Sequence, residues 1–157
     1  MKKFRYPIII LILAVDQLVK YIIRANFEIG ESLDFGRIFS ITYLQNSGAA
    51  FSTMEGKTVL LLILPLIATA AFIWYMEINK DAHWTMYLAI SMVISGGLGN
   101  AIDRAVFGFV TDMFDFHFWP VFNVADIAIV CGCFLLVIYV FWFDKKDGQC
   151  KETVTHL

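Results

Sequence analysis

Charged residues are scarce in this sequence of 157 residues. Only 17% of the residues are Asp, Glu, Lys or Arg, whereas 59% are hydrophobic. A typical soluble domain carries about 25% charged residues. Together with a mean hydropathy of +0.71, this deficit favours an integral membrane protein over a soluble globular domain. The formal net charge of −2 provides no excess of basic residues, so we expect no nucleic-acid partner.

Cysteine is also scarce, with three residues in the whole chain. Cys131 and Cys133 fall in an apolar run, Cys150 lies in the C-terminal tail, and no pair has the CxxC spacing of a zinc or redox site. We therefore expect neither a disulfide framework nor a zinc site.

Long uncharged runs are what the sequence does contain. No charged residue lies between Lys57 and Glu77, and none lies between His83 and Asp103. About 20 apolar residues suffice to cross the hydrocarbon layer of a bilayer. A run that ends at Phe143 is also long enough, and so is the N-terminal run if two polar interruptions are accepted. The sequence predicts four spans, at approximately 6–23, 58–76, 84–102 and 121–143.

The N-terminus has some features of a cleavable signal peptide, because Lys2, Lys3 and Arg5 precede an apolar core at 8–15. Polar residues follow that core at once, at Asp16 and beyond, and no small-x-small cleavage motif follows it. We expect the segment to be retained as the first span.

The orientation follows from the Lys and Arg residues near the spans. Four spans place both termini on one side, with seven basic residues there and four on the other: Lys2, Lys3, Arg5, Lys80, Lys145, Lys146 and Lys151 against Arg24, Arg37, Lys57 and Arg104. The positive-inside rule then puts both termini in the cytoplasm. The loops after the first and third spans face outward.

One sizeable segment lies outside the predicted spans, at 26–57. Its stretch at 37–44 is rich in β-branched and aromatic residues, which predicts a small outer β-sheet. The segment ends in Asn46-Ser47-Gly48-Ala49-Ala50-Phe51, a run of small residues that would let a substrate or another helix approach the backbone, or that simply forms a loop returning to the second span. We see no linker, and we expect residues 1–157 to form a single integral membrane domain.

The third span is rich in small residues at helical spacing. Ser91, Ser95 and Gly99 recur at intervals of four, and Gly96 and Gly97 lie among them. Small residues at this spacing let helices pack closely in lipid. We expect another helix to pack against this face.

Several charged side chains fall within or beside the spans, where an unpaired charge is costly. Asp16 and Lys20 are four residues apart and are expected to form an ion pair on one helical face. Asn100, Asp103 and Arg104 cluster at the outer end of the third span, where Asp103 and Arg104 are candidates for an architectural ion pair across helices.

Two carboxylates are expected at the outer boundary of the membrane. Asp112 lies in the loop after the third span, and Asp126 opens the fourth span, three residues after Asn123. Either carboxylate alone would be read as a solvated residue or a helix cap. Two at one depth, near Asn46 and Asn100, indicate peptide hydrolysis, because neighbouring carboxylates share one proton and can act as base and acid together.

Two alternatives concern the same residues. Asp115 lies three residues beyond Asp112, so a pair of Asp115 and Asp126 is also conceivable. A metalloprotease would use His117 with these aspartates, but the sequence contains no H-E-x-x-H motif. An ion-conducting protein or a non-catalytic assembly protein would also use intramembrane charges, although no repeated halves typical of transporters are visible.

Five blocks of sequence resemble the lipoprotein signal peptidase family, also called signal peptidase II. They occur in the family's order and cover nearly the whole chain except the tail: D-Q-L-V-K from Asp16, N-S-G-A-A-F from Asn46, G-N-A-I-D-R from Gly99, V-T-D-M-F-D from Val110 and F-N-V-A-D from Phe122. Thr111 stands where many members have an apolar residue. The V-x-D pattern favours Asp112 over Asp115.

This resemblance implies a membrane aspartic endopeptidase with no metal and no cofactor. It would remove the signal peptide from diacylglyceryl-modified prolipoproteins, cutting just before the lipidated cysteine, and its partners would be these precursors and membrane lipids. The implied fold is all-α in the membrane, with four transmembrane helices, an outer β-sheet cradle and a short helix or loop after the third span. We expect a monomer in the bacterial cytoplasmic membrane, with its active site at the extracytoplasmic face.

The resemblance also assigns residues. Asp112 and Asp126 are the implied catalytic pair. Asn46 and Arg104 are expected to contact the substrate backbone or lipid. Asp16, Asn100 and Asn123 are expected to support the pair. Lys20 and Gly48 lie in the same matching sequence blocks as these residues.

Overall fold

The computed structural model describes residues 5–48 and 58–143. In chain order, the elements are α1 (Arg5–Asn26), β1 (Ser32–Asp34), β2 (Ser40–Asn46), α2 (Thr58–Ile78), α3 (Trp84–Phe107), β3 (Val110–Asp115) and α4 (Val124–Trp142). Ala49, Ala50, Phe51 and Lys57 lie outside the described residues, as do Cys150 and the basic residues of both termini that were used for the orientation, namely Lys2, Lys3, Lys145, Lys146 and Lys151.

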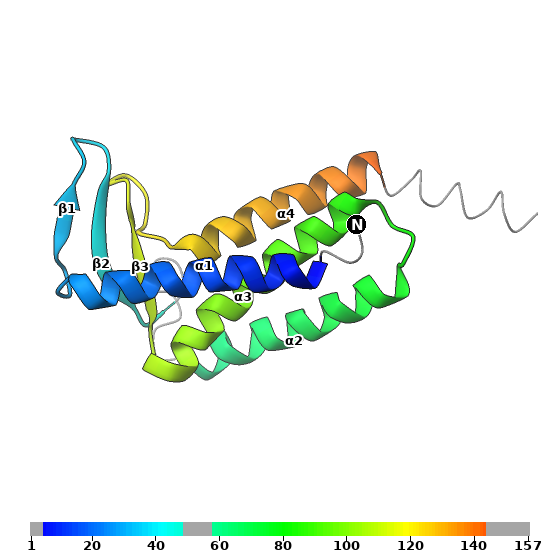
Figure 1. Ribbon diagram of the computed structural model, residues 1–157, viewed down its shortest axis with the longest axis horizontal. Helices are drawn as coiled ribbons and strands as arrows, with labels where there is room; N and C mark the ends of the chain where they lie inside the picture. Colours follow the sequence, from blue (N-terminus) through cyan, green and yellow to red (C-terminus); the bar gives the residue numbers. More distant parts are fainter. Residues whose placement is uncertain (1–4, 49–57, 144–157) are drawn as a thin grey trace, which may run out of the picture.

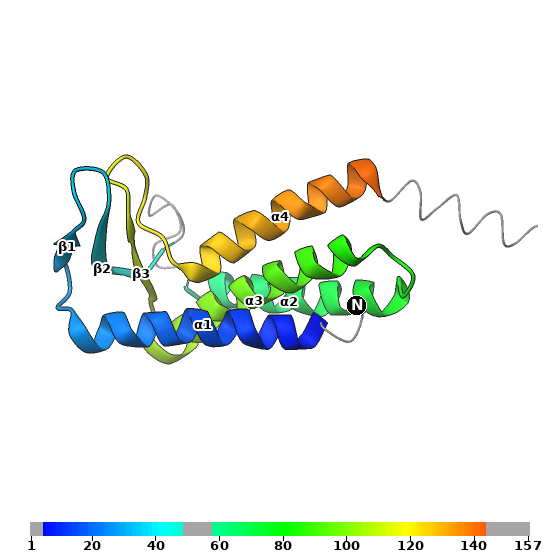
Figure 2. The same ribbon diagram turned by 45° about the horizontal axis from the view of Figure 1, so that its top comes forward.

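The four long helices run alongside one another, and the sheet lies at one end of them (Figure 1). The view turned by 45° shows the same arrangement (Figure 2). The start of α1 and the end of α4 both lie at the end away from the sheet. The fold is therefore mostly helical with a small β element, as the sequence predicted.

The sheet has three antiparallel strands in the order β1-β2-β3. The sequence predicted a sheet at 37–44, and β2 confirms it with a small shift, since it runs from Ser40 to Asn46. The expected loop or short helix after the third span was wrong, because Val110–Asp115 forms β3 and pairs with β2. Gly108 ends α3 in the left-handed conformation, with φ 83°, and thereby turns the chain into that strand.

The polarity of α1 is inverted relative to a helix on the surface of a soluble protein. Its buried face contains Asp16 and Lys20, both fully inaccessible to solvent. Its exposed face consists of large apolar side chains: Ile10, Leu11, Val15, Leu18, Tyr21 and Ile22. Exposed apolar surface on this scale requires a nonpolar surrounding, so this face is suited to lipid.

Three of the described helices are long and apolar enough to cross a membrane, namely those at Val59–Ile78, Trp84–Phe107 and Val124–Trp142. By contrast, α1 carries Asp16, Lys20 and Arg24 and is not among them. The second helix tolerates Pro65 in its interior, as membrane helices commonly do.

Small residues bring α3 and α4 into close contact, as their spacing predicted. A Cβ atom added to Gly96 would lie 2.3 Å from the carbonyl oxygen of Ala125 and 2.7 Å from Cγ1 of Ile129. Both distances are far below van der Waals contact, so any side chain at this position would force α4 away. At the neighbouring Gly97, the nearest atom would be Cβ of Pro65 at 3.6 Å, which is an ordinary contact.

These two glycines provide a matched test of helix packing. Alanine favours a helix over glycine by about 1 kcal/mol, so Gly97→Ala should leave the protein as stable as the wild type or more so. Gly96→Ala should be destabilising by about 1–3 kcal/mol, the usual cost of overpacking a core. Thermal unfolding of the two variants in detergent measures the difference, and equal Tm values would contradict this account of the α3–α4 contact.

Candidate active site

Asp112 lies on β3 and is almost completely buried, with 1% of its surface exposed. Both of its carboxylate oxygens accept hydrogen bonds from side-chain amides. Asn46 Nδ2 donates to Oδ2 at 2.9 Å, and Asn123 Nδ2 donates to Oδ1 at 2.6 Å. Asn46 reaches Asp112 because β2 and β3 are paired, with Leu44 opposite Asp112. The expected position of Asp112 in a loop was wrong, since a regular strand holds it.

Asp126 lies in the first turn of α4, where it forms a capping box with Asn123. The backbone N–H of Asp126 donates to Asn123 Oδ1 at 2.9 Å, and the backbone N–H of Asn123 donates to Asp126 Oδ2 at 3.2 Å. Such reciprocal bonds satisfy N–H groups that the start of a helix leaves free. The capping role considered for a lone carboxylate therefore applies to Asp126, and the cap also fixes the position of its side chain.

Asn100 connects the two aspartates through Asn123. Lys20 Nζ donates to Asn100 Oδ1 at 2.9 Å, and Asn100 Nδ2 donates to Asp126 Oδ1 at 2.8 Å. Because an ammonium group can only donate, the oxygen of the Asn100 amide must face Lys20, which leaves its NH₂ group for Asp126. Asn123 Nδ2 donates to the same Asn100 oxygen at 3.1 Å. A continuous chain of amides therefore joins Asp112 to Asp126.

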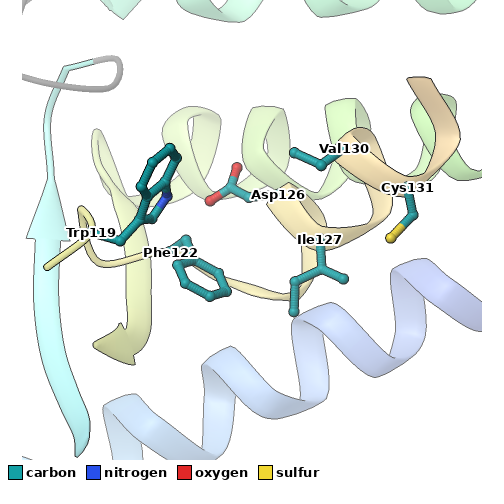
Figure 3. Close-up of a pocket in the computed structure, with 6 residues that line it drawn as sticks. All are labelled: Trp119, Phe122, Asp126, Ile127, Val130 and Cys131. Atoms are coloured by element: carbon teal, nitrogen blue, oxygen red, sulfur yellow. The ribbon is translucent and has the colours of Figure 1, made fainter. Parts of the chain in front are cut away.

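A mostly apolar pocket opens beside Asp126 (Figure 3). It has a volume of about 310 Å³ and is lined by Trp119, Phe122, Asp126, Ile127, Val130 and Cys131. Trp119 and Phe122 come from the segment before α4, and the other four residues lie along the first turns of that helix. Asp126 is the one charged lining residue. Sequence reasoning missed this pocket, because side-chain spacing in α4 does not show what the preceding segment covers.

Arg104 and Gly48 lie beside Asn46. Arg104 Nη2 donates to the carbonyl oxygen of Gly48 at 3.0 Å, and the Gly48 N–H donates to Asn46 Oδ1 at 3.0 Å. Within the described part of the chain, Arg104 Nε is buried without a hydrogen-bond partner. The candidate ion pair of Asp103 with Arg104 was wrong, because Asp103 contacts Lys20 at 3.4 Å and Arg24 at 3.4 Å instead.

The expected ion pair within α1 is confirmed. Lys20 Nζ lies 3.0 Å from Asp16 Oδ2, and both side chains are fully buried. The structure thus brings together all nine residues expected at the site: Asp112, Asp126, Asp16, Lys20, Asn46, Gly48, Asn100, Arg104 and Asn123.

Asp115 lies outside this network. Its carboxylate accepts the backbone N–H of His117 at 2.7 Å and lies 3.6 Å from the His117 ring, at a partly exposed position. Three residues along a strand correspond to about 10 Å, so Asp115 is well separated from Asp112. Among residues 5–48 and 58–143, no group of three His, Cys, Asp or Glu side chains is arranged to hold a metal ion.

Burial raises the pKa of Asp112 to about 7. The main cause is loss of hydration, which disfavours the charged carboxylate. The Asn46 amide lowers the pKa by donating to the charged form, and the nearby charge of Asp126 raises it. Asp112 is therefore substantially protonated near neutral pH.

This raised pKa predicts a pH-dependent stability. A carboxyl that binds its proton more tightly in the folded state stabilises the fold fully below its unfolded pKa of 3.8, and this contribution is lost as pH rises through about 7. The Tm of the wild type should therefore decrease over this range, and the Tm of Asp112→Asn should decrease less. If the Tm values of the two proteins change in parallel with pH, the raised pKa of Asp112 is wrong.

Residues 8–142 match the model of the family described as signal peptidase (SPase) II. The chain is 34% identical over 145 residues to the lipoprotein signal peptidase of Halothermothrix orenii, covering 92% of this chain and 99% of that protein. It is 43% identical over 129 residues to the lipoprotein signal peptidase of Moorella thermoacetica, covering 81% of this chain and 85% of that protein.

Solved structures share the fold as well. A bacterial membrane enzyme determined by the in meso method at 2.3 Å resolution superposes with a TM-score of 0.83 at 32% identity, over 88% of each chain. A second, determined at 1.9 Å resolution, has a TM-score of 0.80 at 32% identity, over 89% of this chain and 94% of that one.

Proposed function

Since this chain belongs to the signal peptidase II family, we propose that it is a membrane-embedded aspartic endopeptidase with Asp112 and Asp126 as its catalytic pair. It removes the signal peptide from diacylglyceryl-modified prolipoproteins by cutting just before the lipidated cysteine. The observation that supports the pair most strongly is the chain of amides that links these two carboxylates and includes no other aspartate.

The environments of the two aspartates favour different roles. Asp112 is buried and has a raised pKa, so it is the carboxyl that stays protonated and donates a hydrogen bond to the scissile carbonyl oxygen. Asp126 borders the open pocket, where water and substrate have access, so it is the base that removes a proton from the attacking water. The water oxygen bonds to the carbonyl carbon while Asp112 gives its proton to the carbonyl oxygen, forming a tetrahedral diol. As the C–N bond breaks, Asp126 passes the proton that it took from water to the departing amine, and Asp112 recovers a proton from a diol hydroxyl. The titration belongs to the pair as a whole.

Other side chains would hold the substrate. Arg104 has a buried Nε–H that lacks a hydrogen-bond partner among residues 5–48 and 58–143, and a substrate carbonyl brought against it would satisfy this donor. It also holds the Gly48 carbonyl, and Gly48 in turn orients Asn46 against Asp112. We assign Asn46, Gly48 and Arg104 to substrate contact, and Asp16, Lys20, Asn100 and Asn123 to support of the pair.

We further propose that α1 is a fourth membrane span and that residues 1–157 form one domain. The charges of Asp16 and Lys20 in the middle of α1 are paired inside the bundle, while the outer face of this helix is apolar. The positive-inside rule then places both termini in the cytoplasm and the sheet, with the catalytic pair, at the extracytoplasmic face. One chain supplies both catalytic carboxyls and the asparagine side chains that bond to them, so a monomer surrounded by membrane lipid suffices for activity.

Neutralising either catalytic carboxyl should abolish cleavage. Asp112→Asn and Asp126→Asn keep the size of the side chain but cannot share a proton, so we expect turnover to fall by at least about 10³-fold, comparable to losing an essential acid or base. The measurement is cleavage of a diacylglyceryl-modified precursor by purified protein in detergent, followed by mass spectrometry. Near-normal turnover by either variant would show that the substituted residue is not a member of the catalytic pair.

Asp115→Asn is the matched control, since it alters the same strand three residues away. Its turnover should equal that of the wild type, because the Asp115 carboxylate contacts only His117 in the described part of the chain. EDTA should also leave turnover unchanged. Loss of activity on chelation would instead support a metalloprotease.

A further inference from the structure

Two buried carboxylates outside the proposed catalytic pair make equivalent contacts on its two sides. Asp103 Oδ2 accepts the backbone N–H of Thr111, the residue before Asp112, at 2.9 Å. Asp16 Oδ1 accepts the backbone N–H of Ala125, the residue before Asp126, at 2.9 Å. Each carboxylate therefore holds the backbone directly next to one member of the pair.

Lys20 joins these two carboxylates. Its Nζ lies 3.0 Å from Asp16 Oδ2 and 3.4 Å from Asp103 Oδ2, and all three side chains are fully buried. Gln17 Nε2 also spans them, donating to Asp16 at 3.1 Å and to Asp103 at 3.4 Å. One ionic cluster on α1 and α3 thus contacts both the strand that carries Asp112 and the helix that carries Asp126.

A further contact fixes β3 at the same point. Arg24 Nη1 lies 3.4 Å from Asp103 Oδ1 and donates to Thr111 Oγ1 at 2.9 Å. The Thr111 residue is therefore held at its backbone by Asp103 and at its side chain by Arg24. This use of the hydroxyl gives Thr111 a role at a position where the resemblance led us to expect an apolar residue.

We propose that Asp103 is a positioning residue for the peptidase reaction. Through the Thr111 amide it fixes Asp112, and through Lys20 it is coupled to Asp16, Ala125 and hence Asp126. The cluster thereby sets the distance between the two reacting carboxyls. This inference rests on the proposed function, and it assigns Asp103 no contact with the substrate.

Asp103 also balances charge around the pair. Within residues 5–48 and 58–143, the charged groups around Asp112 and the cluster are Asp16, Lys20 and Arg24 from α1, Asp103 and Arg104 from α3, and Asp126 from α4. Tyr43 from β2 belongs to an apolar cluster with Ile23 and Met113 instead. The charge of Lys20 favours ionised Asp112. Removing the negative charge of Asp103 leaves Lys20 less compensated and therefore favours ionisation of the pair at lower pH.

The test compares Asp103→Ala, Asp103→Asn and the wild type on a diacylglyceryl-modified precursor, with kcat and KM measured across pH. Asp103→Ala removes both the hydrogen bond and the charge, and we expect kcat to fall about 10²-fold, the typical cost of displacing a reacting group by about 1 Å, with KM unchanged. Asp103→Asn keeps an oxygen for the Thr111 N–H. It should lose less kcat, and the basic limb of its pH profile should move to lower pH.

Glu77→Gln serves as the control, because it removes a different ion pair, with Arg5, near the end of α2. It should leave kcat and the pH profile unchanged. Wild-type kcat in Asp103→Ala, or an unshifted basic limb in Asp103→Asn, would overturn the inference. If Asp103→Ala does not fold, the isosteric Asp103→Asn decides the question. Failure of the wild type to cleave would instead contradict the proposed function itself.

Discussion

A charged side chain buried in a membrane protein needs an opposite charge or hydrogen bonds to offset its lost hydration, and this requirement determines how the helices of this structure pack. Asp16, Lys20 and Asp103 are fully buried between α1 and α3, and each is paired. An unpaired charge in such a place would cost several kcal/mol. The ion pairs allow α1 to turn its charged face inward and its apolar face outward. They also leave carboxylate oxygens free to accept backbone N–H groups from β3 and α4.

Neutral side-chain amides connect this ionic cluster to Asp112 and Asp126 by hydrogen bonds. Asparagine suits the position because its side chain both donates and accepts, so it can pass hydrogen bonds along without adding charge. The fixed donor at Lys20 orients Asn100, and Asn100 and Asn123 then present their NH₂ groups to the carboxylates. A fully bonded network in a low-dielectric interior is rigid, since breaking one bond leaves its partners buried and unsatisfied.

Local spacing predicted the parts of the site that depend on neighbours along the chain. The i, i+4 pair of Asp16 and Lys20 and the i, i+3 relation of Asn123 and Asp126 both appear as expected. The small residues of α3 also pack as predicted, with Gly96 against the Ala125 carbonyl. These features follow from helix geometry alone.

Contacts between distant segments were harder to predict. Val110–Asp115 contains the β-branched and aromatic residues of a strand, but its pairing with β2 depends on residues about 70 positions earlier. Asp103 was expected to pair with its neighbour Arg104, whereas its partners lie on α1 and β3. The pocket beside Asp126 likewise depends on how Trp119 and Phe122 fold over α4.

The proposed mechanism requires that Asp112 and Asp126 share one proton. Infrared spectroscopy of the purified protein with ¹³C-labelled aspartate side chains measures this most directly, because it separates protonated from ionised carboxyls. We expect a protonated aspartate signal near neutral pH that titrates at about 7, disappears in Asp112→Asn and is altered in Asp126→Asn. A spectrum in which every carboxyl is ionised at neutral pH, or in which the signal persists in Asp112→Asn, would contradict it.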